Sequence, residues 1–103
     1  MYHFYFANIV SMKIVWDEPK RVRNAAKHGL DFRDLDADFF AAALILDARS
    51  PRLKAVGVLI EDVIAVVFAV LGSEGISVIS MRRASRQERR LYEQFQSKNP
   101  PPH

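Results

Sequence analysis

Four short apolar runs, separated by turn-forming residues, constrain the fold of this chain more than any other feature. They are Leu44 to Leu46, Ala55 to Ile60, Val63 to Leu71 and Ile76 to Ser80. Ser50-Pro51, Glu61-Asp62 and residues 72–75 separate them and allow tight turns, so sequential antiparallel pairing is the economical topology. The long run from Val63 is nearly all apolar, which suits a central strand covered on both faces. We therefore predict a sheet of about four strands, with helices packed over it.

The segment before this sheet has the pattern of a strand followed by a helix. Lys13 to Trp16 is a short apolar strand, and Asp17 then suits the N-cap of a helix from Glu18 to His28. Pro19 falls in the first helical turn, where its missing N–H does no harm. Gly29 suits the left-handed position that ends a helix.

At 3.6 residues per turn, this first helix has a small-residue face and a basic face. The predicted packing face holds Val22, Ala25, Ala26 and Gly29, and the predicted outward face holds Lys20, Arg23, Asn24 and Lys27. A solvated basic stripe is common, so the helix alone is weak evidence for a partner. The case for an acidic partner becomes stronger because a second basic cluster lies near the end of the chain.

A second helix is predicted from Phe32 to about Ala41, with Asp31 as its cap. Its core-facing residues would be Phe32, Leu35, Phe39 and Phe40, and its water-facing residues Asp34, Asp36 and Asp38. Two helices joined by a glycine turn raise the possibility of a DNA-reading helix-turn-helix. The three aspartates argue against it, because DNA phosphates would repel them. They also lack the glycine-containing loop of a calcium site and fit a solvated helix face better.

The last strand leads directly into a cluster of arginines. Ser85 followed by Glu88 fits a capping box, which predicts a helix from Arg86 to about Lys98 and leaves Arg82 and Arg83 on the turn before it. Guanidiniums held close together repel one another, so we expect this cluster to bind an anion, most plausibly a phosphate backbone. The competing interpretation is a solvated arginine face.

Composition limits the architecture and the class of partner. The chain has 103 residues, half of them hydrophobic, which is enough for one domain with a core. The absence of cysteine excludes disulfides and thiolate zinc sites and suits a cytoplasmic protein. A net charge of +3 favours an acidic partner, and the apolar runs are too short to span a membrane. We expect an α+β domain at residues 12–98, preceded by a dispensable extension, Met1 to Ser11, and followed by a proline-rich tail, 99–103.

Two blocks of the sequence closely resemble the BrnT family of type II toxins. The first contains Trp16-Asp17, Lys20, Asn24 and Lys27-His28-Gly29 with Phe32; the second contains the segment 79–84 (ISMRRA) with Glu88-Arg89 and Tyr92. The resemblance covers Met12 to about Glu93. It implies a RelE-like fold, ribonuclease activity that halts translation, and neutralisation by a BrnA-like antitoxin with a DNA-binding domain, which would bring the complex to its operator DNA. This chain departs from the family pattern at two places. Family members usually carry an arginine at the position of Ser77. They also carry two acidic residues followed by an arginine where this chain reads Arg49-Ser50-Pro51-Arg52, so that only Arg52 matches.

The residues are compatible with a ribonuclease that needs no metal and no cofactor. Such a reaction needs cations on the phosphate and groups that move protons to and from the ribose oxygens. The candidate catalytic residues are Arg82, Arg83, His28 and Glu88, with His28 the natural candidate for proton transfer because imidazole is the side chain suited to that role near neutral pH. The candidate nucleic-acid-binding residues are Lys20, Asn24, Lys27, Arg52, Arg89 and Trp16. Tyr92 is interpreted as a packing residue. The alternative function is a basic nucleic-acid-binding module, or a toxin remnant, without turnover.

Overall fold

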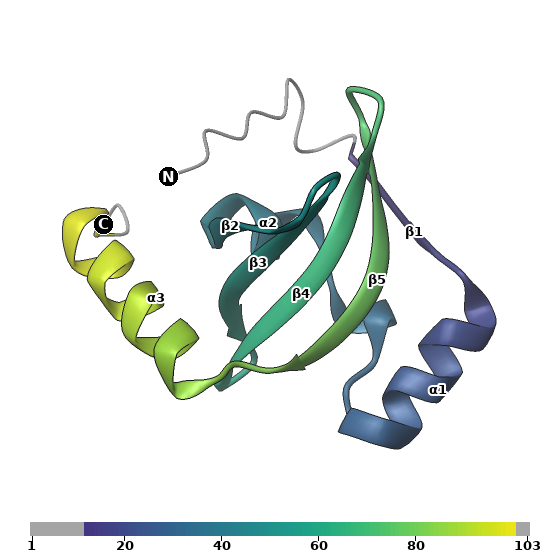
Figure 1. Ribbon diagram of the computed structural model, residues 1–103, viewed down its shortest axis with the longest axis horizontal. Helices are drawn as coiled ribbons and strands as arrows, with labels where there is room; N and C mark the ends of the chain where they lie inside the picture. The colour runs from purple at the N-terminus through teal and green to yellow at the C-terminus, as the bar shows by residue number, and fades with distance from the viewer. Residues whose placement is uncertain (1–11, 101–103) are drawn as a thin grey trace.

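A five-stranded mixed sheet forms the centre of the computed structural model, which describes residues 12–100 (Figure 1). The strands are β1 (Lys13–Trp16), β2 (Leu44–Arg49), β3 (Arg52–Leu59), β4 (Asp62–Leu71) and β5 (Gly75–Arg83). Their order across the sheet is β1-β5-β4-β3-β2, and the last four strands of the chain pair antiparallel in sequence order. β1 joins the far edge parallel to β5. The predicted topology, including the extra N-terminal strand, is confirmed.

The turns between the strands fall close to the predicted positions. Residues 72–74 form the β4–β5 turn, and Gly72 takes a positive φ of 61° there. The β3–β4 turn is displaced by one residue from its predicted place, because Asp62 already pairs with Leu59 as the first residue of β4. The turn therefore contains Ile60, which has a φ of 60° and is 84% exposed.

Two of the three predicted helices form with their predicted bounds and caps. α1 (Glu18–His28) begins at Asp17, whose carboxylate accepts from the Lys20 N–H, and ends at Gly29 with a φ of 69°. α3 (Arg86–Lys98) begins with the complete Ser85–Glu88 capping box. In Figure 1 these two helices lie on opposite sides of the sheet. The capping chemistry thus predicted where each helix starts.

The predicted second helix is wrong, because the segment contains two short helical turns in place of one helix. A 3₁₀ turn, η2 (Phe32–Asp34), is capped by Asp31, and α2 (Ala37–Ala42) is capped separately by Asp36. Leu35 lies between them with an extended backbone. Aspartate side chains that accept from nearby N–H groups compete with helical hydrogen bonds, so the second cap restarts the helix. The predicted core residues of this segment are all buried: Phe32, Leu35, Phe39 and Phe40.

Each face of the sheet has its own apolar cluster. The larger cluster packs η2 and α2 against alternate residues of the strands and includes Phe32, Phe40, Phe68, Ile76 and Met81. The smaller cluster packs α3 against the other face and includes Val56, Ala65 and Tyr92. β4 contributes to both clusters, which confirms its prediction as a central strand covered on both faces.

The packing face of α1 differs from the predicted one. Val22 is 54% exposed, whereas Asn24 is 8% exposed. The Asn24 side-chain amide donates to the Met81 carbonyl at 2.8 Å and accepts from the Met81 N–H at 3.1 Å. β1 pairs with β5 only as far as Val78. Asn24 therefore takes the place of the missing strand partner, because its amide carries the donor and acceptor of a peptide group. The predicted outward position of Asn24 is wrong.

Candidate functional site

Arg82, Glu88 and Lys54 form one ion-paired cluster on the α3 side of the sheet. Arg82 donates hydrogen bonds to Glu88 from both terminal nitrogens, from Nη1 to Oε1 at 2.7 Å and from Nη2 to Oε2 at 3.0 Å. Lys54 of β3 reaches the same carboxylate, with Nζ 2.6 Å from Oε2. β5 and the first turn of α3 thus hold a carboxylate between two cations from neighbouring parts of the sheet.

Glu88 is buried and fully engaged in this cluster. It is 5% exposed, and its Oε1 also accepts from the Ser85 N–H at 2.8 Å as part of the capping box. The hydrogen bonds from Arg82, followed by that from Lys54, hold the pKa of Glu88 well below its usual range, against the opposing effect of burial. The bond to Glu88 in turn raises the pKa of Arg82. The Glu88 carboxylate and the Arg82 guanidinium therefore remain charged across the physiological pH range.

Lys54 did not emerge from the sequence as a site residue. It lies in β3 opposite Val67, which lies opposite Ser80 of β5. Arg82 is in the next row of the same face, opposite Ala65. Because side chains alternate across a strand, a lysine between the apolar residues Leu53 and Ala55 was the signal that could have found it.

The predicted turn that carries Arg82 and Arg83 is wrong, because both residues end β5. Side chains alternate along a strand, so the two arginines leave on opposite sides. Arg83 reaches α1, where Nη1 donates to the His28 carbonyl at 3.2 Å, and its Nη2 lies 3.7 Å from Asp62. The structure thus brings Arg82 together with Glu88, and Arg83 together with His28, as two separate groups.

The remaining predicted residues divide between exposed cations and packing residues. Lys20, Lys27 and Arg52 are exposed. Arg89 is half-buried and its Nε donates to the Ala84 carbonyl at 3.3 Å. Trp16 is half-buried, with its indole N–H bonded to Glu18 at 3.0 Å and its ring edge-on to Phe32 at a centroid distance of 6.4 Å. Its observed contacts are those of a packing residue.

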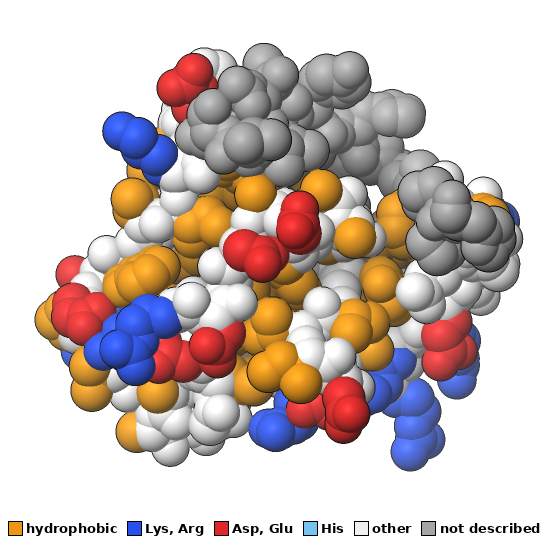
Figure 2. Space-filling view, turned by 180° about the vertical axis from the view of Figure 1, so that it is seen from behind, with side chains coloured by type: hydrophobic (Ala, Val, Ile, Leu, Met, Phe, Trp, Pro, Cys, Tyr) orange, Lys and Arg blue, Asp and Glu red, His pale blue; other side chains and the backbone are white. Residues whose placement is uncertain are grey.

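On the face that Figure 2 shows, basic side chains do not form one continuous patch. Figure 2 shows the molecule from behind, with basic and acidic side chains beside one another among apolar ones. Alternating signs weaken the long-range attraction of a polyanion. The Arg82 cluster is a local group of cations that can contact a phosphate.

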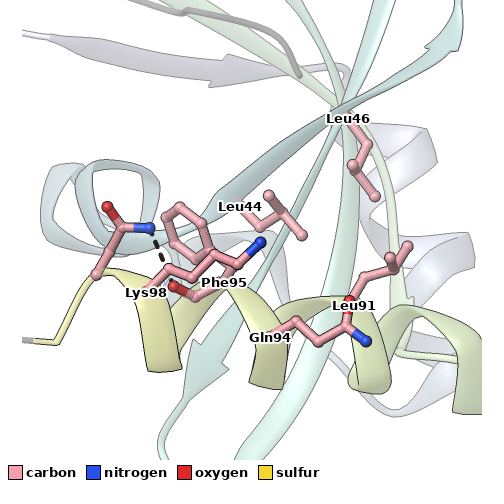
Figure 3. Close-up of a pocket in the computed structure, with 7 residues that line it drawn as sticks. Leu44, Leu46, Leu91, Gln94, Phe95 and Lys98 are labelled. Atoms are coloured by element: carbon pink, nitrogen blue, oxygen red, sulfur yellow. Dashed lines mark hydrogen bonds between the residues drawn. The ribbon is translucent and has the colours of Figure 1, made fainter.

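A second feature on the α3 side is an apolar groove between α3 and β2. Leu44 and Leu46 line it from the strand, and Leu91 and Phe95 from the helix (Figure 3). Such a lining suits apolar side chains of a partner. Gln94, Lys98 and Asn99 complete the lining of the groove.

Among residues 12–100, no group of three or more His, Cys, Asp or Glu side chains is placed to hold a metal ion. In the same part of the chain, every helix is too short or too polar to cross a membrane.

A small α+β domain with a cationic cluster on one sheet face is the class of protein that the structure defines. Residues 16–88 match the family described as the ribonuclease toxin BrnT of type II toxin-antitoxin systems. A similar solved structure is the Brucella abortus ribonuclease toxin BrnT, with 54% identity and a TM-score of 0.69 over 73% of this chain and 99% of that one. The search of curated proteins finds no match. This chain belongs to the BrnT family of ribonuclease toxins, as the two sequence blocks predicted. Membership implies an RNA substrate and an antitoxin partner.

Proposed function

We propose that this chain is an endoribonuclease that cuts RNA without a metal ion and thereby stops translation. The observation that carries the proposal is that Arg82 is held by Glu88 but, within the described part of the chain, keeps two donor hydrogens free. Three of its five donor hydrogens are used, two on Glu88 and one on the Arg83 carbonyl at 3.2 Å. Nε–H and the second hydrogen of Nη2, which point outward from the same edge of the planar guanidinium, have no partner among the described residues. They form a free fork that suits two oxygens of a phosphate.

Cleavage of RNA without a metal makes a bond from the ribose 2′-oxygen to phosphorus and breaks the bond from phosphorus to the 5′-oxygen. The 2′-OH loses a proton, the leaving oxygen gains one, and negative charge grows on the phosphate oxygens in between. A guanidinium fixed before substrate arrives stabilises that charge without having to reorganise. Arg82 meets this requirement because Glu88 holds it and its side chain is 40% exposed.

The other predicted residues receive supporting roles in this proposal. The exposed cations Lys20, Lys27 and Arg52, with Arg89, contact the RNA backbone on either side of the cut. Proton transfer by His28 stays a prediction, as does a phosphate contact by Arg83, which lies against the His28 carbonyl. Replacing His28 by glutamine should slow cleavage and leave melting unchanged if the imidazole moves a proton.

The proposed partner is a BrnA-like antitoxin with a DNA-binding domain, through which the complex reaches operator DNA. Binding energy in protein complexes is concentrated in buried anchors. The apolar groove of Leu44, Leu46, Leu91 and Phe95 offers such anchoring positions, whereas Arg82 is one half-exposed cation. Loss of Arg82 should therefore weaken the antitoxin complex far less than it weakens cleavage.

The decisive experiment measures cleavage of RNA by the purified chain in EDTA. We expect cutting to persist in the chelator and to fall about 10²- to 10³-fold in Arg82→Ala. Arg86→Ala is the matched control, because Arg86 is exposed at the start of α3. Loss of cutting in EDTA with rescue by a divalent ion would overturn the metal-free mechanism. RNA binding without any cutting would favour the non-catalytic alternative.

A further inference from the structure

We propose that Lys54 is the second phosphate-binding cation of the site, and that Glu88 is a positioning residue that fixes Lys54 and Arg82 beside each other. The inference rests on the proposed ribonuclease function and deepens it. It assigns a catalytic role to a residue outside the two sequence blocks that resemble the family, and it makes Glu88, a candidate catalytic residue, a positioning residue.

The first argument is that Lys54 is poorly explained by stability. Its side chain is 22% exposed and lies in a strand whose neighbours Leu53, Ala55 and Val56 are buried. Removing an ammonium from water is costly, and an apolar residue of the same length often stabilises such a position better than an ion pair does. A lysine kept at this position is therefore best explained by a use for its charge.

The second argument comes from the donors that remain free. Nζ of Lys54 and Nη2 of Arg82 both contact Oε2 of Glu88, at 2.6 and 3.0 Å. The two cationic nitrogens are therefore close enough for oxygens of one phosphate to reach both. An ammonium has three donors, of which Lys54 gives one to Glu88. Its two remaining donors, together with the fork of Arg82, match the oxygens of a single phosphodiester.

The third argument concerns Glu88. Its Oε1 accepts from Arg82 and from the Ser85 N–H, and its Oε2 accepts from Arg82 and from Lys54. These four contacts occupy about all the lone-pair sites of a carboxylate. The low pKa of Glu88 also makes it a weak base near neutral pH. It can hold the two cations, but it has no free acceptor for a ribose proton.

In the reaction, the pair would act as charge develops on the phosphate. The fork of Arg82 and the ammonium of Lys54 contact oxygens of the same phosphate, while Glu88 offsets one of the two positive charges. The site thus keeps an excess of one positive charge before RNA binds. Both cations are fixed in advance by the same carboxylate, which is the condition under which electrostatic stabilisation is strongest.

The test uses the full chain with Lys54→Met and Lys54→Arg, and Lys13→Met as the control. Lys13 is an exposed strand lysine on β1. We expect Lys54→Met to lower kcat for RNA cleavage about 10²- to 10³-fold and Lys54→Arg to recover part of the loss, because charge is retained. Melting curves confirm that each variant is folded. A folded Lys54→Met protein that cleaves like the parent would overturn the inference.

Glu88→Gln separates positioning from proton transfer. Glutamine can keep the capping bond to Ser85, so the start of α3 is preserved. We expect lower activity with the acid limb of the pH profile of kcat unchanged, because Glu88 is not the titrating group. An acid limb that disappears in Glu88→Gln would show that Glu88 is the base after all.

Binding of a 2′-O-methyl oligoribonucleotide distinguishes failure of the inference from failure of the proposed function. This probe keeps its phosphates but lacks the attacking 2′-OH. If the parent binds the probe and cuts no RNA, the proposed function fails, and weaker probe binding by Lys54→Met but not by Lys13→Met would still support the two-cation site. If the parent cuts RNA and Lys54→Met binds and cuts equally well, only the inference fails.

Discussion

At the residue scale, Asn24 has the most unexpected role in the structure. A side chain on a helix completes the hydrogen bonding of β5, at a point where β1 has ended. Helical periodicity assigned it to the outward face, because the helix has few large apolar residues with which to define a packing side. The pattern could not reveal the unpaired Met81 backbone, which is a property of the folded sheet.

We predict that Asn24→Ala destabilises the protein by about 2 kcal/mol or more, since it leaves a buried N–H and C=O of Met81 unpaired. Urea unfolding measures the change. Arg23→Ala is the matched control on the same helix, where Arg23 is exposed, and should change stability by less than about 0.5 kcal/mol. Equal unfolding midpoints for the two variants would contradict the strand-replacing role of Asn24.

The candidate site was predicted in part at this scale. Arg82 and Glu88 could be found because a charged turn and a capping box are both local signals. Lys54 comes from another strand, and only the pairing of β3 through β4 to β5 brings it to the same face. The sequence did not predict that Arg82 and Arg83 point in opposite directions. That prediction requires knowing that β5 continues to Arg83, beyond the apolar run from Ile76 to Ser80.

At the scale of elements, a network of ion pairs joins α1 to η2. Arg21 pairs with Glu18 at 2.7 Å and with Asp31 at 3.1 Å, and Arg33 also pairs with Asp31. Bonds from Arg21 lower the pKa of Glu18 from 4.5 to about 2, and bonds from Arg33 lower that of Asp31 from 3.8 to about 2. The first turn of α1 is thus tied to the cap of the next element.

These shifts predict how stability depends on pH. A carboxylate whose folded pKa is depressed stabilises the protein above its unfolded pKa, and this contribution is lost as pH falls toward the folded value. The melting temperature should therefore be nearly constant above about pH 5 and fall between pH 4.5 and about 2. Glu88 contributes in the same direction.

Asp31→Asn provides the control for the acid prediction. The variant should melt lower than the parent at pH 7 and fall less steeply in acid, because one of the depressed carboxylates is absent. A parent protein whose melting temperature is unchanged from pH 6 to about 2.5 would contradict the assigned pKa directions.

Most elements were predictable because their signals are local. The caps at Asp17 and Ser85 and the glycine at the end of α1 are short patterns that fix helix ends. The split between η2 and α2 was missed because Asp36 was interpreted as a solvated helix residue. Only its bond to the Phe39 N–H shows that it is a cap.

At the scale of the whole molecule, the larger apolar cluster and the candidate site lie on opposite faces of the sheet. One face is filled by η2, α2 and the larger apolar cluster. The other is partly covered by α3, which carries Glu88 to Arg82 and Lys54 and leaves Arg82 accessible. A charged cluster can persist there because the stability of the fold depends mainly on the opposite face.

The last prediction concerns the extent of the domain. The Brucella structure is matched over 99% of its length by 73% of this chain, so a substantial part of this chain lies outside the match. Met1 to Ser11 lie outside the described residues. Residues 12–100 contain a five-stranded sheet and two apolar clusters. We expect removal of residues 1–11 to leave RNA cleavage unchanged and the melting temperature within about 2 °C of the parent.

Removal of residues 1–16 is the matched control for this truncation. It also deletes β1, which pairs with β5 along its whole length and packs Ile14 and Trp16 against the larger apolar cluster. Loss of that burial should lower the melting temperature by about 10 °C or more, or make the protein insoluble. If the shorter deletion alone lowers melting by several degrees, residues 1–11 are part of the folded domain, and its boundary lies before Met12.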